Sequence, residues 1–253
     1  MFKSSRKKLI AIGCSFTEDC NSFSPWPIHL AEKLDMDCVN LGKSGSGNEQ
    51  ILSKILDTVL TEKNIGLVVV MWSGWQRVDF QIIDSRWITL NPAWNPVKFK
   101  KKINQIELTQ VEITAAGLLE INTPHHAVQS TLRSFIYAEN LLKDIPHLYI
   151  QGVAPITRYH GQDLGSDGSI RVAMKSFIDS HYSDYVDKHI SNKFIGWPCF
   201  SRLNGYCIND LLNNIDPEKK ELRLSDKSHP NEQGHKYMAK VILDGYEKYN
   251  IMR

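Results

Sequence analysis

The sequence predicts an α/β fold built around a parallel β-sheet. Short apolar runs of strand length alternate with longer stretches in which apolar residues recur every three or four positions, the spacing of a helix with one buried face. Residues 66–71 form a continuous apolar run, as expected for a strand that is covered on both faces. Strands that alternate with helices in this way form parallel sheets, because each helix returns the chain to the start of the next strand.

The composition is that of one globular domain. The chain has 253 residues, of which 42% are hydrophobic and 23% are charged, so it can bury a large core. The formal net charge of +2 gives no reason to expect binding to nucleic acid. No apolar segment has the length of a membrane span or of a signal peptide. We therefore expect a single cytoplasmic domain over residues 1–253, with its five cysteines reduced because their spacing fits neither a disulfide framework nor a zinc site.

The first third of the chain is predicted to form three strands and two helices. Residues 9–13 are an apolar run that ends in glycine, which is typical of a buried strand before a turn. Residues 27–34 have helical spacing and begin with proline, which is favoured in the first turn of a helix. A second strand at 38–41 leads into a loop with three glycines, and the apolar face of the next helix runs over 51–60. The third strand is the run at 66–71.

The regular alternation breaks after the third strand. Residues 78–123 contain short β-like pieces, at 86–90 and 105–113, with two Asn-Pro pairs at 91–92 and 95–96 between them. Such a stretch is typical of an insertion rather than of a second domain. A helix over 125–143 then has one apolar face, and 147–150 is predicted to be the fourth strand.

The last third of the chain is predicted to complete the sheet and its helices. Residues 157–193 begin with glycine and polar groups, so we expect a surface excursion that includes a helical stretch at about 170–186. A short fifth strand is expected at 194–197. The chain then ends in an amphipathic helix over 233–249.

An Asp and a His are separated by two residues near the end of the chain, in Asp226-Lys-Ser-His229-Pro230. The residue before a proline is disfavoured in a helix and proline suits the first helical turn, so we expect both side chains on a loop that enters the last helix. An Asp that accepts the Nδ1 proton of His229 leaves Nε2 free to take a proton from a nucleophile. The pair alone also allows metal binding or no function. We expect no metal, because only His235 joins this pair, without a cysteine at zinc spacing, and His235 is itself expected to be solvated.

Three strand ends carry the other candidate residues, because ligands of a parallel sheet bind at the carboxyl ends of its strands. Ser15 follows the first strand on a turn beside Gly13 and is the candidate nucleophile. The loop at 42–48 follows the second strand, and its three glycines allow backbone N–H groups to approach a developing oxyanion. The third strand ends in Trp72-Ser-Gly-Trp-Gln-Arg77.

These stretches resemble, in the same order, the four sequence blocks of the SGNH (GDSL-like) hydrolases. The blocks are Gly13-Cys-Ser15-Phe-Thr, Asn40-Leu-Gly-Lys-Ser-Gly45, Gly74-Trp-Gln-Arg77 and Asp226-Lys-Ser-His229-Pro. The resemblance implies a flavodoxin-like three-layer α/β/α sandwich and the hydrolysis of esters, thioesters or sugar O-acetyl groups without a cofactor. It also implies that Ser15 is the nucleophile, His229 the base and Asp226 the orienting acid, with the N–H groups of Ser15 and Gly45 as oxyanion donors.

Two positions depart from the family's pattern. Cys14 stands where the first block usually has an aspartate, which removes none of the three catalytic roles. Gln76 and Arg77 stand where the third block usually has Asn-Asp, and the family's asparagine donates to the oxyanion. Gln76 is also an amide donor but is one methylene longer, and the loss of one such donor costs a factor of about 10² to 10³ in turnover. We expect Gln76 to be the third oxyanion donor, with Arg77 or backbone groups as the alternatives.

The predicted function is that of a serine esterase, or acylhydrolase, acting on a small-molecule or carbohydrate ester through an acyl-Ser15 intermediate. Trp72 and Trp75 flank the third block and are expected to line the substrate pocket. Arg77 is expected to pair with an anionic substrate or with an acidic residue of the insertion. The alternative is a degenerate, non-catalytic module that binds glycans or takes part in assembly, which the altered third block favours.

Overall fold

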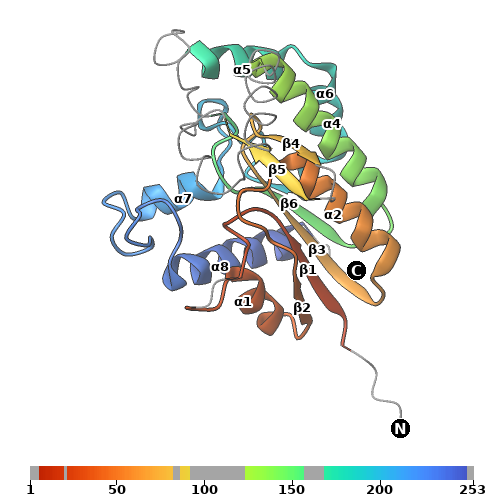
Figure 1. Ribbon diagram of the computed structural model, residues 1–253, viewed down its shortest axis with the longest axis vertical. Helices are drawn as coiled ribbons and strands as arrows, with labels where there is room; N and C mark the ends of the chain where they lie inside the picture. The colour runs from red at the N-terminus through yellow and green to blue at the C-terminus, as the bar shows by residue number, and fades with distance from the viewer. Residues whose placement is uncertain (1–5, 20–21, 82–85, 92–122, 157–167, 250–253) are drawn as a thin grey trace, which may run out of the picture.

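A five-stranded parallel sheet forms the centre of the protein (Figure 1). The computed structural model describes residues 6–19, 22–81, 86–91, 123–156 and 168–249. The strands of the sheet are β1 (Lys8–Ile12), β2 (Asp37–Asn40), β3 (Ile65–Trp72), β6 (His147–Gln151) and β7 (Phe194–Ile195). Their order across the sheet is β2-β1-β3-β6-β7.

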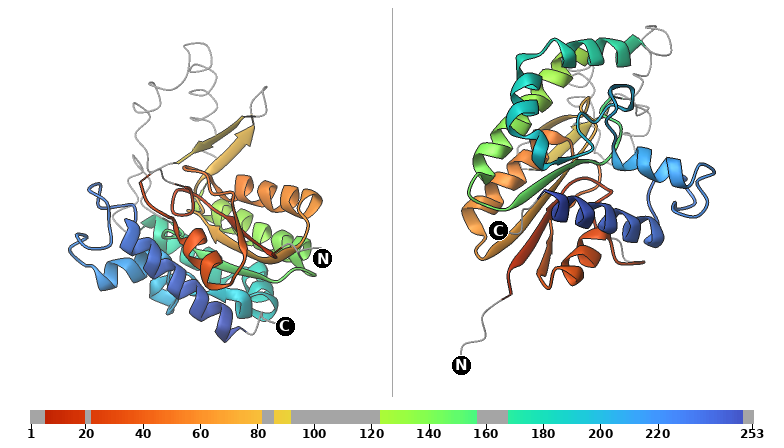
Figure 2. Two further views of the ribbon diagram at one scale, coloured as in Figure 1. Left: turned by 90° about the horizontal axis from the view of Figure 1, so that it is seen from below. Right: turned by 180° about the vertical axis from the view of Figure 1, so that it is seen from behind.

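Helices cover both faces of this sheet (Figure 2). One face carries α1 (Trp26–Lys33), α7 (Ile208–Ile215) and α8 (Glu232–Lys248). The other face carries α2 (Asn48–Thr61), α4 (Pro124–Leu142), α5 (Gly168–Ile178) and α6 (His181–His189). The predicted flavodoxin-like three-layer α/β/α sandwich is thereby confirmed. Among the helices in the described part of the chain, none combines the length and the apolar character of a membrane span.

Strand β3 shows why its sequence is apolar at every position. Val68 and Val70 point into the layer with α2 and α4, whereas Leu67 and Val69 point into the layer with α1 and α8. All four are completely buried. Successive side chains of a strand face opposite sides of a sheet, so a strand between two helical layers needs apolar residues at both parities. Each such side chain contributes about 1.5–3 kcal/mol relative to an exposed one.

The five predicted strands are confirmed, with β7 shorter than expected. The helical stretch predicted at about 170–186 is confirmed. It consists of two helices, α5 and α6, and α6 starts where the Ser180 side chain accepts a hydrogen bond from the Tyr182 N–H at 3.3 Å. The described part of 157–193 is no surface excursion, however, since Ala173 and Val186 are completely buried in the layer with α4.

The insertion after β3 begins with a β-hairpin. Strands β4 (Val78–Gln81) and β5 (Trp87–Leu90) pair in antiparallel orientation and form a sheet of their own. The β-like piece predicted at 86–90 is confirmed by β5, whereas the piece predicted at 105–113 lies outside the described residues. Helix α7 was not predicted, because its short apolar pattern lies in a stretch rich in Asn and Asp.

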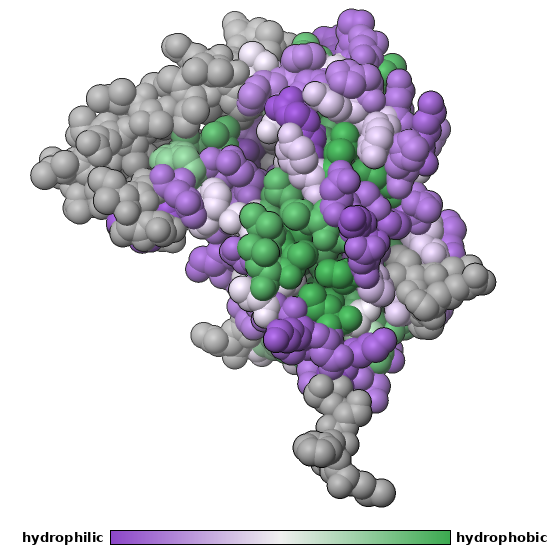
Figure 3. All heavy atoms as spheres, turned by 90° about the vertical axis from the view of Figure 1, so that its right-hand side faces the viewer, coloured by the Kyte–Doolittle hydropathy of each residue, from purple (hydrophilic) through white to green (hydrophobic). Residues whose placement is uncertain are grey.

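Apolar side chains gather on the side of the molecule where α2 and α4 lie (Figure 3). Leu56 and Leu60 of α2 are 42% and 73% exposed, and Tyr137 of α4 is 56% exposed. Helix α2 packs against α4 and β4, whereas these three side chains face solvent.

His235 is buried between α8 and α1, contrary to the expectation that it is solvated. It is 4% exposed, and its Nδ1 accepts a hydrogen bond from the Trp26 backbone N–H at 3.2 Å. The Phe23 ring lies against it, with 5.4 Å between ring centroids. Burial, together with the nearby His29 and His229, lowers the pKa of His235 to about 4. An imidazole nitrogen accepts a hydrogen bond only when it carries no proton, so this contact requires the neutral form of His235, and the lowered pKa favours the same form.

The low pKa of His235 predicts that the protein loses stability in mild acid. The unfolded chain binds this proton at an ordinary pKa near 6.5 and the folded protein only at about 4, so the stabilisation is complete above pH 6.5 and falls as the pH drops. Between pH 7 and pH 4 the loss in the free energy of unfolding is about 3 kcal/mol. Urea unfolding at both pH values measures it, with His235→Asn, which keeps an acceptor for Trp26, expected to lack this component.

The exposed His126 provides the control, since His126→Asn should retain the pH dependence of the wild type. An equal loss of stability in the wild type and in His235→Asn would show that another group is responsible.

Candidate active site

Ser15, His229 and Asp226 lie in one hydrogen-bonded chain. The Nε2 atom of His229 is 3.2 Å from the Ser15 Oγ, and its Nδ1 atom is 2.5 Å from the Asp226 Oδ2. In this arrangement a histidine can take the proton of a serine hydroxyl while a carboxylate holds the ring in the required tautomer. The structure thus brings together the three residues predicted to be catalytic.

Asp226 is held as an anion by the loop that carries it. Its Oδ1 atom accepts hydrogen bonds from the backbone N–H groups of Ser228 and His229, at 2.8 and 2.9 Å. Burial opposes ionisation, but these bonds and the bond from the His229 ring outweigh it and hold the pKa of Asp226 well below its usual range. The side chains of Asp226 and His229 are 47% and 42% exposed, so the site is open to solvent.

The candidate catalytic loop, residues 224–229, is closed by backbone hydrogen bonds. The Leu224 N–H donates to the His229 carbonyl at 2.8 Å, and the Asn231 N–H donates to the Leu222 carbonyl at 3.0 Å. The Asn231 side chain then caps α8 by accepting from the Gly234 N–H at 3.0 Å. The predicted position of the loop before the last helix is correct. Pro230 precedes the N-cap, however, and does not lie in the first helical turn.

Ser15 lies on a tight turn directly after β1. The Thr17 N–H donates to the Cys14 carbonyl at 2.9 Å, which closes the turn. A Cβ atom on Gly13 would lie 2.3 Å from the Thr17 Oγ1 and 3.0 Å from the Met71 carbonyl oxygen, so a larger residue would disturb the turn. Cys14, at the position where the related family usually has an aspartate, is completely buried among apolar residues of the α1 and α8 layer.

The glycine loop after β2, residues 42–47, is docked on the turn that carries Ser15. The Lys43 N–H donates to the Gly13 carbonyl at 3.0 Å, and the Asn40 Nδ2 donates to the Thr17 carbonyl at 2.7 Å. A Cβ atom on Gly42 would lie 2.5 Å from the Thr17 carbonyl carbon, so only glycine allows this approach. Gly45 has a φ of +84°, in the left-handed region that favours glycine. The predicted oxyanion donor thus belongs to a loop that contacts the nucleophile turn.

The end of β3 and the hairpin after it hold the glycine loop from its other side. The Arg77 Nη1 donates to the Ser46 carbonyl at 2.8 Å. The Asp79 carboxylate accepts from the N–H groups of Gly47 and Gln50, each at 3.0 Å. Burial raises the pKa of Asp79, and the Gln50 hydrogen bond and the charge of Arg77 act against the rise. The charge of Arg77 thus acts on Asp79, an acidic residue of the insertion, and the pairing of Arg77 with such a residue or with an anionic substrate stays a prediction.

The expectation that Trp72 and Trp75 line a substrate pocket is wrong in this structure, because both rings belong to the core. Trp72 is 0% exposed and Trp75 is 2% exposed. Trp72 is the last residue of β3 and packs on Phe135 of α4, with 4.9 Å between ring centroids. The Trp75 Nε1 donates to the Gln151 Oε1 at 3.0 Å. Gln76 is 3% exposed in the turn after β3, and its role as an oxyanion donor stays a prediction.

Sequence reasoning missed three buried polar residues near the site. Asn48 accepts from the Ser73 N–H at 2.8 Å and so joins α2 to the end of β3. Asp79 caps α2, as described above. Arg223 donates to the Ser228 carbonyl at 2.7 Å, within the catalytic loop. Asp79 and Arg223 lie close in sequence to the third and fourth blocks, and this proximity is the signal that could have drawn attention to them.

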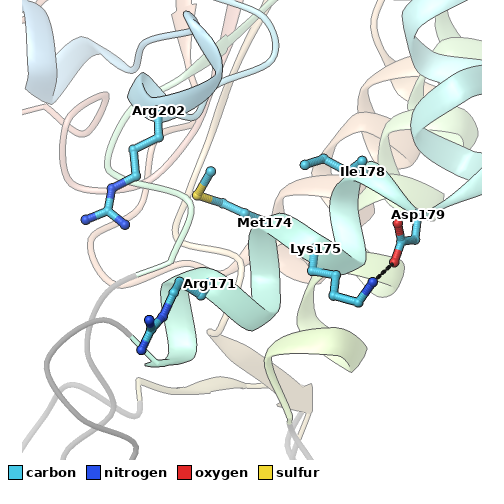
Figure 4. Close-up of a pocket in the computed structure, with 6 residues that line it drawn as sticks. All are labelled: Arg171, Met174, Lys175, Ile178, Asp179 and Arg202. Atoms are coloured by element: carbon cyan, nitrogen blue, oxygen red, sulfur yellow. Dashed lines mark hydrogen bonds and ion pairs between the residues drawn. The ribbon is translucent and has the colours of Figure 1, made fainter.

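A separate hollow lies between α5 and the turn at Ser201–Leu203 (Figure 4). Its volume is about 400 Å³, and its lining comprises Arg171, Met174, Lys175, Ile178, Asp179 and Arg202. Lys175 is paired with Asp179 at 2.7 Å. None of the predicted catalytic residues lines this hollow. In the described part of the chain, no three His, Cys, Asp or Glu side chains are grouped so that they could hold a metal ion.

Comparison with known proteins shows similarity in structure but not in sequence. No family model and no curated protein matches the chain. A catalytic mutant of an acetylxylan esterase from Geobacillus stearothermophilus matches with a TM-score of 0.51 and 15% identity, over 97% of this chain and 96% of that chain. A member of the lipolytic G-D-S-L family from Veillonella parvula matches with a TM-score of 0.48 and 14% identity, over 96% and 99% of the two chains. The protein therefore shares its α/β fold with the acetylxylan esterase over nearly the whole length of both chains.

Proposed function

We propose that the protein is a serine hydrolase that cleaves an ester bond through an acyl intermediate on Ser15. The observation that carries this proposal is the hydrogen-bonded chain from Ser15 through His229 to Asp226. Its place at the carboxyl end of β1 supports the proposal, because parallel sheets bind their ligands there. The fold shared with an acetylxylan esterase favours an O-acetyl group on a carbohydrate as the substrate, and a small-molecule ester is the broader class.

In the first half of the reaction, His229 Nε2 takes the hydroxyl proton of Ser15 while Oγ attacks the ester carbonyl carbon. The carbonyl oxygen becomes an oxyanion, which accepts hydrogen bonds from the N–H groups of Ser15 and Gly45 and from the Gln76 amide. The C–O bond of the ester then breaks, and the alcohol leaves with the proton from His229. The acyl group remains bound to Ser15.

In the second half, a water molecule replaces the alcohol. His229 takes a proton from the water as the water oxygen attacks the acyl carbon. The N–H groups of Ser15 and Gly45 and the Gln76 amide then stabilise the second oxyanion. The bond to Ser15 breaks, Oγ recovers a proton from His229, and the free acid leaves. Asp226 stays ionised throughout, which its low pKa favours, and it stabilises the imidazolium that forms in each half.

A non-catalytic module that binds glycans or takes part in assembly is the second candidate. The observation in its favour is the third block, where Gln76 and Arg77 replace the family's Asn-Asp pair. Binding of acetylated xylan without release of acetate, together with the absence of labelling at Ser15, would support this function over hydrolysis.

Replacement of the nucleophile is the direct test of the proposed reaction. Ser15→Ala should lower kcat for 4-nitrophenyl acetate by about 10⁴-fold or more, because it removes the hydroxyl that lies 3.2 Å from the His229 Nε2. It should also abolish labelling by a fluorophosphonate, which reacts with activated serines. Ser201→Ala, at an exposed serine, is the matched control and should label and hydrolyse like the wild type. Undiminished labelling of Ser15→Ala would contradict the assignment.

Gln76 can be tested as the third oxyanion donor by Gln76→Leu, which removes the amide from a buried side chain of similar size. The expected result is a fall in kcat of about 10²- to 10³-fold with little change in KM, because the donor acts on charge that develops in the transition state. Gln129→Leu, on α4, is the control, since it removes an amide that donates to the Ser176 carbonyl at 3.3 Å and has no predicted part in the reaction. A Gln76→Leu enzyme with the kcat of the wild type would show that backbone groups alone hold the oxyanion.

A further inference from the structure

Arg223 is an almost completely buried cation beside the catalytic loop. It is 4% exposed. Its guanidinium donates to the Ser228 carbonyl at 2.7 Å, to the Asn209 Oδ1 at 2.8 Å, to the Asn213 Oδ1 at 3.0 Å and to the Asn209 carbonyl at 3.4 Å. All of these acceptors are neutral. Among the described residues, no carboxylate lies within ion-pairing distance of it.

A buried cation holds a loop only at a cost in desolvation free energy. Burial of a charge without a paired carboxylate is unfavourable, and the Arg223 Nε has no hydrogen-bond partner among the described residues. Burial lowers the pKa of Arg223, while the charges of Asp216 and Asp226 oppose the change. An arginine nevertheless remains protonated in proteins. The contacts of this cation therefore need an explanation beyond the stability of the fold.

The guanidinium contacts both segments that meet at the active site. The Ser228 carbonyl belongs to the peptide group that joins Ser228 to His229, so the 2.7 Å bond limits rotation of the backbone that carries the imidazole. On its other side, the Arg223 Cζ lies 5.9 Å from the centroid of the Phe16 ring. Phe16 is the residue after Ser15, and its ring meets the His229 imidazole edge-on, with 6.0 Å between centroids and 64° between planes.

Helix α7 fixes the guanidinium in turn. Asn209 and Asn213 are one turn apart on this helix and both accept from the Arg223 Nη2. The Asn209 N–H donates to the Gly152 carbonyl at 3.0 Å, directly after β6. Arg223 is thus anchored to the carboxyl edge of the sheet, the same edge from which Ser15 projects.

We propose that Arg223 is a positioning residue for the reaction, which fixes the distance and angle between the His229 Nε2 and the Ser15 Oγ. It touches neither the ester nor the reacting atoms, and it acts through Ser228 and Phe16. The inference rests on the proposed function, because the alignment matters only if His229 activates Ser15. A simple tether of the loop would instead affect stability and leave the turnover of the folded enzyme unchanged.

The test compares Arg223→Met and Arg223→Lys in the full chain. The measurements are kcat and KM for 4-nitrophenyl acetate and the rate of fluorophosphonate labelling, at a temperature where circular dichroism shows each variant to be folded. Arg223→Met should lower kcat and the labelling rate by about 10- to 100-fold, with KM within about twofold of the wild type, because small misplacements of reacting groups cost this much. Arg223→Lys should recover only part of the rate, since lysine keeps the charge but not the planar fork of donors.

Arg133→Met is the matched control. Arg133 also lies over an aromatic ring, that of Tyr182 at 5.8 Å, but on the opposite face of the sheet, and its loss should leave kcat unchanged. If Arg223→Met does not fold, Asn213→Ala removes one anchor and should lower kcat several-fold at constant KM. A folded Arg223→Met variant with the kcat of the wild type would overturn the role of Arg223 but not the proposed function. Where Asn213→Ala replaces that variant, a wild-type kcat in Asn213→Ala would have the same meaning. A wild-type protein that neither labels nor hydrolyses overturns the proposed function as well.

Discussion

The packing of α8 against α1 is the interaction on which the geometry of the candidate site depends. Apolar side chains of both helices, among them Leu30 and Ile242, share one buried layer beneath the sheet. Helix α8 begins three residues after His229, and β1 ends three residues before Ser15. Because α8 lies on the face that also carries α1, its first turn brings the catalytic loop to the end of β1. The apolar packing of α8 on α1, which has no directional requirement, thus sets the position of the directional hydrogen bond between His229 and Ser15.

Buried polar groups then select one arrangement of the loops around Ser15. Asn40 holds the glycine loop against the nucleophile turn, Asn48 joins it to the end of β3, and Asp79 caps the helix that follows. Each of these side chains satisfies backbone groups that would otherwise be buried without partners, so any other loop arrangement leaves several of them unsatisfied. The same logic applies to Arg223, whose acceptors all come from segments at the edge of the site. The result is a hydrogen-bonded surround for Asp226 and His229, whose side chains are themselves partly exposed to solvent.

The parts of this structure that could be predicted from the sequence are those set by local patterns. Strand β3 was predictable because both its faces are buried. The loop position of Asp226 and His229 was predictable because Pro230 disfavours a helix at the residue before it. The predictions that were wrong or missing concern residues whose surroundings are set by other segments of the chain. An aromatic residue such as Trp75 suits a pocket wall or a core equally well, and only the placement of α4 decides between them. The start of α6 depends on a single cap at Ser180, and the roles of Asp79 and Arg223 arise from contacts with other segments of the chain.

The hydrogen bond between Ser15 and His229 joins residues that are 214 positions apart. During synthesis from the amino terminus, β1, β2 and β3 are available to pair well before His229 is made. Ser15 therefore lies on its turn without its histidine partner until the loop at 224–229 is complete and α8 docks. A ribosome-bound chain should lack the proposed hydrolysis even when most of its sheet has formed, and esterase activity in a cell-free translation should count finished molecules only.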